Sequence, residues 1–207
     1  MELTATHQEA LAELINIGYG RAAASLSQLT NRRIILEVPK IGIHTIDAVI
    51  AALREVLSGE VASVHQLFSG AVPGHALLLM DREAALTLNS LLLDEKQIAG
   101  ELRQSQREVL TEIGNILLTA CLGVFGNILQ VEMTFSVPRF HVDSVEDVLK
   151  SATFRSGELQ YAMMIHTRFQ VRTSNVSGYL MIILGVTSLS RLTSKLDLWE
   201  QGQAPAI

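Results

Sequence analysis

The side chains with the clearest potential for chemistry are carboxylates and an amide spaced along one predicted helix. Glu9, Glu13 and Asn16 are separated by four and by three residues. In an α-helix these spacings bring the three side chains to one face, because residues three and four apart are neighbours on the helix surface. A carboxylate can bind a cation, and a neutral amide can hold a water molecule. The trio could do both, although a single such group is also typical of an ordinary solvated helix face.

The same trio occurs a second time in the chain. Glu108, Glu112, Asn115 and Pro138 lie 99 residues after Glu9, Glu13, Asn16 and Pro39, so the pattern E-x3-E-x2-N-x22-P is present twice. Core positions have diverged between the copies, as Leu26 and Phe125 illustrate. Helix surfaces usually diverge faster than cores, so identical polar surface residues in both copies indicate a function.

Further matches indicate that the whole chain is a tandem duplication. Leu11 matches Leu110 at the same offset, and the segment 74–80 resembles 178–184 at an offset of 104. We interpret residues 1–99 and 100–207 as two repeats of one unit. No Gly/Ser/Pro-rich linker separates them, so we expect a single composite domain over residues 1–207.

The elements that must position these residues follow the same order in each unit. We expect a long amphipathic helix, a strand ended by proline, a short helix, a hairpin of two strands and a closing helix. The expected ranges are Thr4–Leu29, Ile34–Val38, Thr45–Leu57, Val61–Phe68, His75–Met80 and Arg82–Leu93, then Gln104–Leu129, Val131–Val137, Ser144–Ala152, Leu159–Val171, Gly178–Val186 and Ser188–Trp199. Helix and strand do not alternate regularly, so a parallel sheet is disfavoured. The predicted fold class is α+β, an antiparallel β-sheet packed by long amphipathic helices with pseudo-two-fold symmetry.

Composition excludes two classes of partner. The chain has 16 basic and 21 acidic residues, a formal net charge of −5, and no basic stripe, so nucleic-acid binding is not expected. Mean hydropathy is +0.31, but the longest clean apolar run, Tyr179–Val186, is only eight residues. A spanning helix needs roughly 20. The acidic, amphipathic start of the chain does not resemble a signal peptide. We therefore expect a cytoplasmic protein without membrane insertion.

Metal and cysteine chemistry are also disfavoured. The single cysteine, Cys121, lies in an apolar helical stretch, so packing is its expected role. The six histidines include no pair at the spacing of metal ligands, and no metal site is expected.

The duplicated motif resembles that of the CheC/CheX/FliY family of chemotaxis phosphatases, which act on the phosphorylated response regulator CheY. The family motif reads [D/S]-x3-E-x2-N-x22-P, and residues 16–27 also resemble the first helix of CheC. The presence of two motifs makes the chain most similar to CheC-type members. One departure is that Glu9 and Glu108 replace the leading Asp or Ser, which keeps a carboxylate but lengthens it.

The resemblance implies a phosphatase that removes the aspartyl phosphate of a CheY-like response regulator. Asn16 and Asn115 would then position the attacking water, as a glutamine does in GTPases. By the same resemblance, Glu13 and Glu112 would engage the active-site lysine of the regulator. Mg²⁺ would be held by the regulator, so this chain would need no cofactor of its own.

The resemblance also implies CheD, a receptor deamidase, as a second partner. The short helix Ser144–Ala152 carries Glu146 and Asp147, whereas its counterpart Thr45–Leu57 is more apolar. An ordinary solvated helix is the alternative interpretation. Two functional alternatives stay open: a non-catalytic module that binds phosphorylated CheY, as FliM does without Glu/Asn pairs, and an adaptor for CheD.

Overall fold

The computed structural model describes residues 4–57, 59–93, 102–153, 160–171 and 173–200. The elements are α1 (Ala5–Thr30), β1 (Ile34–Thr45), α2 (Ile46–Val56), β2 (Glu60–Gly70), β3 (Gly74–Asp81), α3 (Arg82–Leu93), α4 (Gln104–Leu129), β4 (Met133–Phe135), β5 (Arg139–Ser144), α5 (Val145–Ser151), β6 (Gln160–Val171), β7 (Ser174–Gly185) and α6 (Val186–Glu200). The predicted boundary between the two repeats lies outside the described residues, so the division at residue 99 stays a prediction. The C-terminal tail also lies outside them.

The strands of the described residues form one antiparallel sheet in the order β1-β6-β7-β3-β2-β4, with β5 also paired to β2. The first strand of each half therefore pairs with the hairpin of the other half. At the centre, Leu77 on β3 is paired with Met181 on β7, and these two residues are related by the same offset of 104 that relates the two hairpins in the sequence. The predicted α+β fold is confirmed, and the strand order is symmetric about its central pair.

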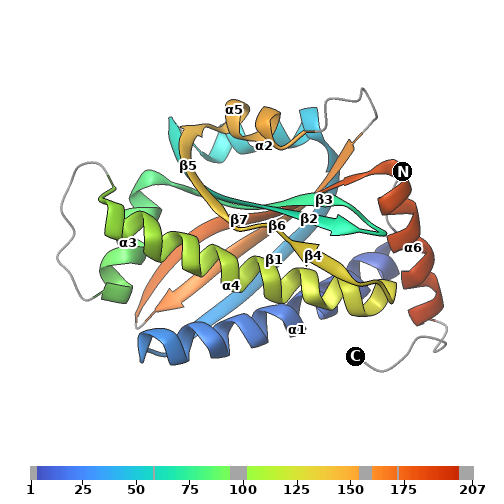
Figure 1. Ribbon diagram of the computed structural model, residues 1–207, viewed down its shortest axis with the longest axis horizontal. Coiled ribbons are helices and arrows are strands. Elements are labelled where there is room, and N and C mark those ends of the chain that lie inside the picture. The colour runs from blue at the N-terminus through green and yellow to red at the C-terminus, as the bar shows by residue number, and fades with distance from the viewer. Residues whose placement is uncertain (1–3, 58, 94–101, 154–159, 172, 201–207) are drawn as a thin grey trace.

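The molecule has three layers, which Figure 1 shows from the side. The long helices α1 and α4 run in opposite directions along one face of the sheet, and α2 and α5 lie side by side on the other. The helices α3 and α6 lie toward opposite ends of the molecule (Figure 1).

The sheet is buried on both faces at its centre. Along β7, Leu180, Ile182 and Leu184 belong to the core beneath α1 and α4. The alternate residues Met181 and Ile183 belong to the smaller core beneath α2 and α5. Side chains of a strand alternate between faces, so a strand covered on both sides is apolar at every position. This explains why the longest apolar run of the sequence is a central strand.

The helices α1 and α4 approach closely where α1 has a glycine. A Cβ atom added at Gly18 would lie 3.1 Å from the Cα atom of Cys121 and 3.2 Å from the carbonyl oxygen of Ala120. The missing side chain thus lets the two backbones meet, and Cys121 is fully buried in that contact, as its predicted packing role requires. The burial raises the pKa of the Cys121 thiol.

The prediction that proline ends the first strand of each unit is wrong for the first unit. Strand β1 continues through Pro39 to Thr45, with an irregularity in its pairing to β6 between Glu37 and Lys40. This is how an edge strand tolerates a residue without an N–H group. In the second unit the strand does break: β4 ends at Phe135, and β5 begins at Arg139, directly after Pro138.

Candidate functional site

The first motif lies on the outer face of α1. Its buried side consists of His7, Ala10, Leu11, Leu14, Ile15, Gly18, Tyr19, Ala22 and Leu26. Glu9, Glu13 and Asn16 alternate with those residues at helical spacing and are all exposed. The trio predicted from the sequence therefore lies together on one solvent-facing strip of a helix that is anchored by its opposite side.

The second motif lies on α4 in the same way, with one difference. Leu110, Ile113, Leu117, Leu118 and Cys121 are buried, whereas Glu108 and Glu112 are exposed. Asn115 is half-buried. The sequence predicts an exposed side chain, and the difference arises because Asn115 contacts the neighbouring strand β2.

The contact partner of Asn115 is Gln66 of β2, which is only 2% exposed. The Gln66 Nε2 atom donates to the Asn115 Oδ1 atom at 3.4 Å and to the carbonyl oxygen of Ser136 at 3.0 Å. Thr119, one turn further along α4, also directs its hydroxyl at Asn115 Oδ1, at 3.5 Å. The carbonyl end of the Asn115 amide is thus held by the protein.

Asn16 has no such support. Within the part of the chain that the structure describes, its side chain makes no hydrogen bond to another residue. In β6 the position that corresponds to Gln66 is Thr167. Phe68 lies opposite Phe135, and Phe169 lies opposite Leu36, which is 99 residues before Phe135, so Gln66 and Thr167 each come two residues before corresponding phenylalanines. Thr167 is fully buried, and its hydroxyl is hydrogen-bonded to the Tyr19 hydroxyl. The two motifs are therefore alike in sequence and in placement but differ in what surrounds the asparagine.

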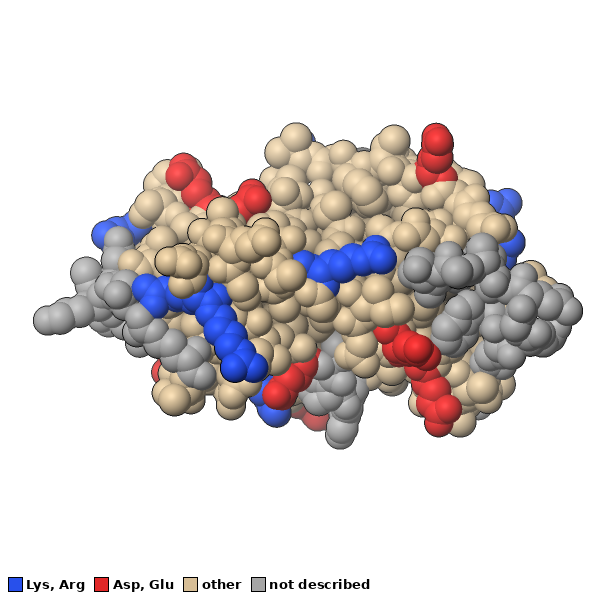
Figure 2. Space-filling view, turned by 90° about the horizontal axis from the view of Figure 1, so that it is seen from below, with Lys and Arg blue, Asp and Glu red and all other residues tan. Residues whose placement is uncertain are grey.

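The motif glutamates are available to a cationic partner. Among the described residues, neither Glu13 nor Glu112 forms an ion pair. Figure 2 shows the face seen from below Figure 1, where acidic side chains project at separate places and Lys and Arg side chains lie between them. The charge on this face is mixed, so recognition of a cation would depend on individual carboxylates and not on a broad acidic patch.

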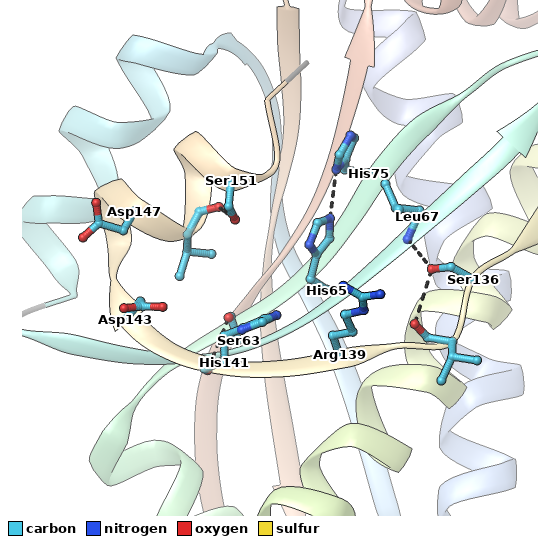
Figure 3. Close-up of a pocket in the computed structure, with 12 residues that line it drawn as sticks. Ser63, His65, Leu67, His75, Ser136, Arg139, His141, Asp143, Asp147 and Ser151 are labelled. Carbon is cyan, nitrogen blue, oxygen red and sulfur yellow. Dashed lines mark hydrogen bonds between the residues drawn. The ribbon is translucent and has the colours of Figure 1, made fainter. Parts of the chain in front are cut away.

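A separate cavity of about 590 Å³ lies on the opposite face of β2, between that strand, β5 and α5. Figure 3 shows His65, His75, His141 and Arg139 around it, with Asp147 on α5 at its far side. The His65 Nε2 and His75 Nδ1 atoms are 2.9 Å apart, and the two rings are stacked. Sequence spacing gave no sign of this pair, because the β2–β3 hairpin brings together residues ten positions apart.

The surroundings of both histidines favour the neutral form. Burial lowers the pKa of His65 to about 4, assisted by the neighbouring His75, His141 and Arg139. Burial also lowers the pKa of His75. Within the described ranges, no group of three or more His, Cys, Asp or Glu side chains is arranged to hold a metal ion.

Among the residues that the structure describes, one helix is long and apolar enough to cross a membrane by length and composition alone. The most apolar 18-residue window of the segment Gln104–Asn127 of α4 has a mean hydropathy of 1.7, and half of that window is buried inside the protein. Its apolar residues belong to the core beneath the sheet, and a core helix meets the same criteria.

Residues 7–43 match the model of the CheC-like family. The matched segment holds the complete first motif, from Glu9 to Pro39. The resemblance to the CheC-like family is thereby confirmed. The second copy of the CheC-like motif, at 108–138, lies outside the matched segment.

Solved structures share the fold of this chain. FliY from Thermotoga maritima superimposes with a TM-score of 0.75 at 17% identity, over 95% of this chain and 98% of that one. The middle domain of FliM from H. pylori gives a TM-score of 0.66 at 12% identity, over 93% of this chain and 99% of that one. At these identities the likeness establishes the fold and leaves the chemistry to be argued from the site.

Proposed function

We propose that this protein is a phosphatase that hydrolyses the aspartyl phosphate of a CheY-like response regulator. The CheC-like match and the fold shared with FliY and FliM support a protein of the chemotaxis and flagellar-switch group. The observation that carries the finer proposal is the presence, on two core-anchored helices, of a glutamate and an asparagine three residues apart on the outward side.

The chemistry of the substrate suits these residue types. Hydrolysis of an aspartyl phosphate forms a bond between water oxygen and phosphorus and breaks the bond from phosphorus to the carboxylate oxygen. The departing carboxylate is a weak base with an ordinary pKa of about 3.9, so its departure needs no proton donor near neutral pH. What the reaction needs is a water held in line with the leaving oxygen, and a fixed amide can supply that placement.

The division of labour within each pair follows from charge. Asn16 and Asn115 carry no charge, and in this proposal they orient the attacking water. Glu13 and Glu112 carry exposed carboxylates, and they bind the lysine in the active site of the regulator. The Mg²⁺ ion needed for phosphoryl chemistry belongs to the regulator, and a cytoplasmic location is part of the proposal.

A turnover experiment tests this function against the alternative of a non-catalytic binding protein. A CheY-like regulator is phosphorylated with a small-molecule phosphodonor, the donor is removed, and phosphate release is followed with this protein at one-twentieth of the regulator concentration. A phosphatase accelerates release of all the phosphate through many turnovers. A binding module or an adaptor for CheD leaves the release rate unchanged at that ratio, and that result would overturn the proposal.

A further inference from the structure

Gln66 is a polar residue on the face of β2 that otherwise packs apolar side chains into the core. Its neighbours on the same face of β2, Val64 and Phe68, are buried in the core beneath α4. The Gln66 Oε1 atom is buried without a hydrogen-bond partner among the described residues. Burying an amide with one end unsatisfied costs stability, so core packing does not explain a glutamine here.

The segment around Ser136 fixes which end of the Gln66 amide faces α4. The Ser136 N–H donates to the Leu67 carbonyl oxygen and the Leu67 N–H donates to Ser136 Oγ, each at 2.9 Å. The second of these bonds is drawn in Figure 3. A backbone carbonyl can only accept a hydrogen bond. The Ser136 carbonyl therefore requires the NH₂ end of the Gln66 amide, and Oε1 must point away.

The same argument extends to Asn115. The Gln66 NH₂ group needs an acceptor for its other hydrogen, and only the oxygen end of the Asn115 amide can accept. Asn115 Oδ1 consequently faces β2, and its NH₂ end is turned away from the sheet. The hydrogen bonds from Gln66 to Ser136 and to Asn115 thus fix the orientation of the Asn115 amide relative to a backbone segment that is itself hydrogen-bonded to β2.

We propose that Gln66 is a positioning residue for the α4 site, which it organises by fixing the amide of Asn115. This inference rests on the proposed phosphatase function and assigns a role to a residue outside the motif. The α1 site lacks this contact, since the corresponding residue of β6 is Thr167, whose hydroxyl is hydrogen-bonded to Tyr19. The first half of the chain therefore contributes to the site of the second, because Gln66 belongs to the first half and Asn115 to the second.

The test uses two single-site proteins, so that each helix is measured alone. Asn16→Ala leaves only the α4 site, and Asn115→Ala leaves only the α1 site. Gln66→Met, which keeps the length of the side chain and removes its amide, is introduced into both. Ile165→Met is the control, since it alters a fully buried position on β6 whose aliphatic side chain cannot hydrogen-bond to an asparagine.

In the α4-only protein, we expect Gln66→Met to lower kcat about tenfold, the effect of a misplaced positioning group, with KM for the phosphorylated regulator unchanged. The α1-only protein should lose less than twofold. Ile165→Met should change kcat by less than twofold in both single-site proteins. Equal losses in both single-site proteins, or no loss in the α4-only protein, would overturn the role of Gln66.

A second readout does not depend on activity. In NMR relaxation spectra, the side-chain NH₂ group of Asn115 should be ordered in the wild-type protein and mobile in Gln66→Met. If neither single-site protein releases phosphate, the proposed function fails, while this measurement still decides the positioning role. An Asn115 amide with the same order parameter in both proteins contradicts it.

Discussion

A neutral amide is an unusual choice for a hydrolytic site, and its consequence is independence from pH. Asparagine does not titrate, so Asn16 and Asn115 would hold water in the same way at any pH at which the protein is folded. The glutamates of the pairs do titrate, but their proposed task is to attract a lysine. Chemistry and docking would therefore be separable by mutation.

The first prediction concerns that separation. Glu13→Lys and Glu112→Lys should each weaken binding to the phosphorylated regulator, because a like charge would face its lysine. The matched changes Asn16→Ala and Asn115→Ala should leave affinity within about twofold, since they remove a positioning group that acts in the chemical step. Titration calorimetry with a stably phosphorylated regulator analogue checks both.

The outcome that contradicts this division is a glutamate variant that binds normally, or an asparagine variant that does not bind. The glutamate variants should also keep the free energy of unfolding within about 0.5 kcal/mol of wild type, because exposed helix positions tolerate substitution. A larger loss would mean that Glu13 or Glu112 supports the fold.

Residue spacing predicted the motif but not its support. The spacing of Glu13 and Asn16 is enough to predict a shared helix face, since that depends only on helix geometry. The contact between Asn115 and Gln66 joins residues 49 positions apart, and only the sheet order brings them together. One sequence signal existed: Val64, Gln66 and Phe68 alternate along a strand, and the middle residue is polar where its neighbours are apolar.

At the scale of elements, the spacing between α1 and α4 is controlled by Gly18. Gly18→Ala should destabilise the protein by about 1–3 kcal/mol, because the new methyl group would press on the backbone of α4. Gly20→Ala is the matched control on the same helix: its Cβ meets nothing within 4 Å. That change should stabilise the helix by up to about 1 kcal/mol.

Chemical denaturation of the two variants measures the difference. A change in the free energy of unfolding with the same sign in Gly18→Ala and Gly20→Ala would contradict the close approach of α1 and α4 at Gly18. The comparison is informative because both substitutions add the same methyl group to one helix, so helix propensity cancels between them.

The short helix α5 carries the proposed CheD-binding surface, and its contacts refine the choice of mutation. Ser144 Oγ donates to Asp147 Oδ2 at 2.7 Å and accepts from the Asp147 N–H at 3.1 Å, so Asp147 helps to cap the helix. Glu146 forms ion pairs with Lys150 and with Arg54 of α2. Of the two acidic residues, Asp147 is the more exposed.

Asp147→Asn therefore tests CheD binding better than charge reversal does. The amide oxygen of asparagine can still accept the bond from Ser144, so the cap is kept while the charge is lost. Affinity for purified CheD should fall several-fold, and phosphate release without CheD should not change. Unaltered affinity in calorimetry, or two equivalent binding sites per chain, would reject this surface as the CheD site.

Proline was a poorer guide to the elements than the hydrophobic pattern. The predicted helices agree with the structure to within two residues, because apolar spacing fixes the buried stripe. The end of the first strand was misplaced at Pro39, since an edge strand can bypass a proline with an irregular pairing. The matching Pro138 does break its strand, so identical motifs adopt different local structures in the two halves.

At the scale of the whole molecule, the stacked pair of half-buried His65 and buried His75 makes stability depend on pH. The pKa of His65 is about 4 in the folded protein, whereas an unfolded histidine has a pKa near 6.5. Above pH 6.5 both states are neutral at this residue and it has no effect. As the pH falls from 6.5 to 4, the unfolded chain gains a proton that the folded chain does not, so stability decreases.

Thermal unfolding at pH 7 and at pH 5 measures this effect. The melting temperature of the wild-type protein should be lower at pH 5 than at pH 7. The melting temperature of His65→Gln should decrease by less over the same change, because the substitution removes the titrating group nearest to His75, His141 and Arg139. An equal fall in both proteins would show that other groups control the pH dependence.

The symmetric sheet gives the molecule two similar helix faces, and the central claim is that both are catalytic through their asparagines. The measurement that tests it most directly is phosphate release from a phosphorylated CheY-like regulator by the double variant Asn16→Ala/Asn115→Ala. We predict a loss of about 100-fold or more, with the melting temperature and regulator affinity close to wild type and with partial losses in each single variant. A double variant that folds, binds and releases phosphate at the wild-type rate would contradict the account.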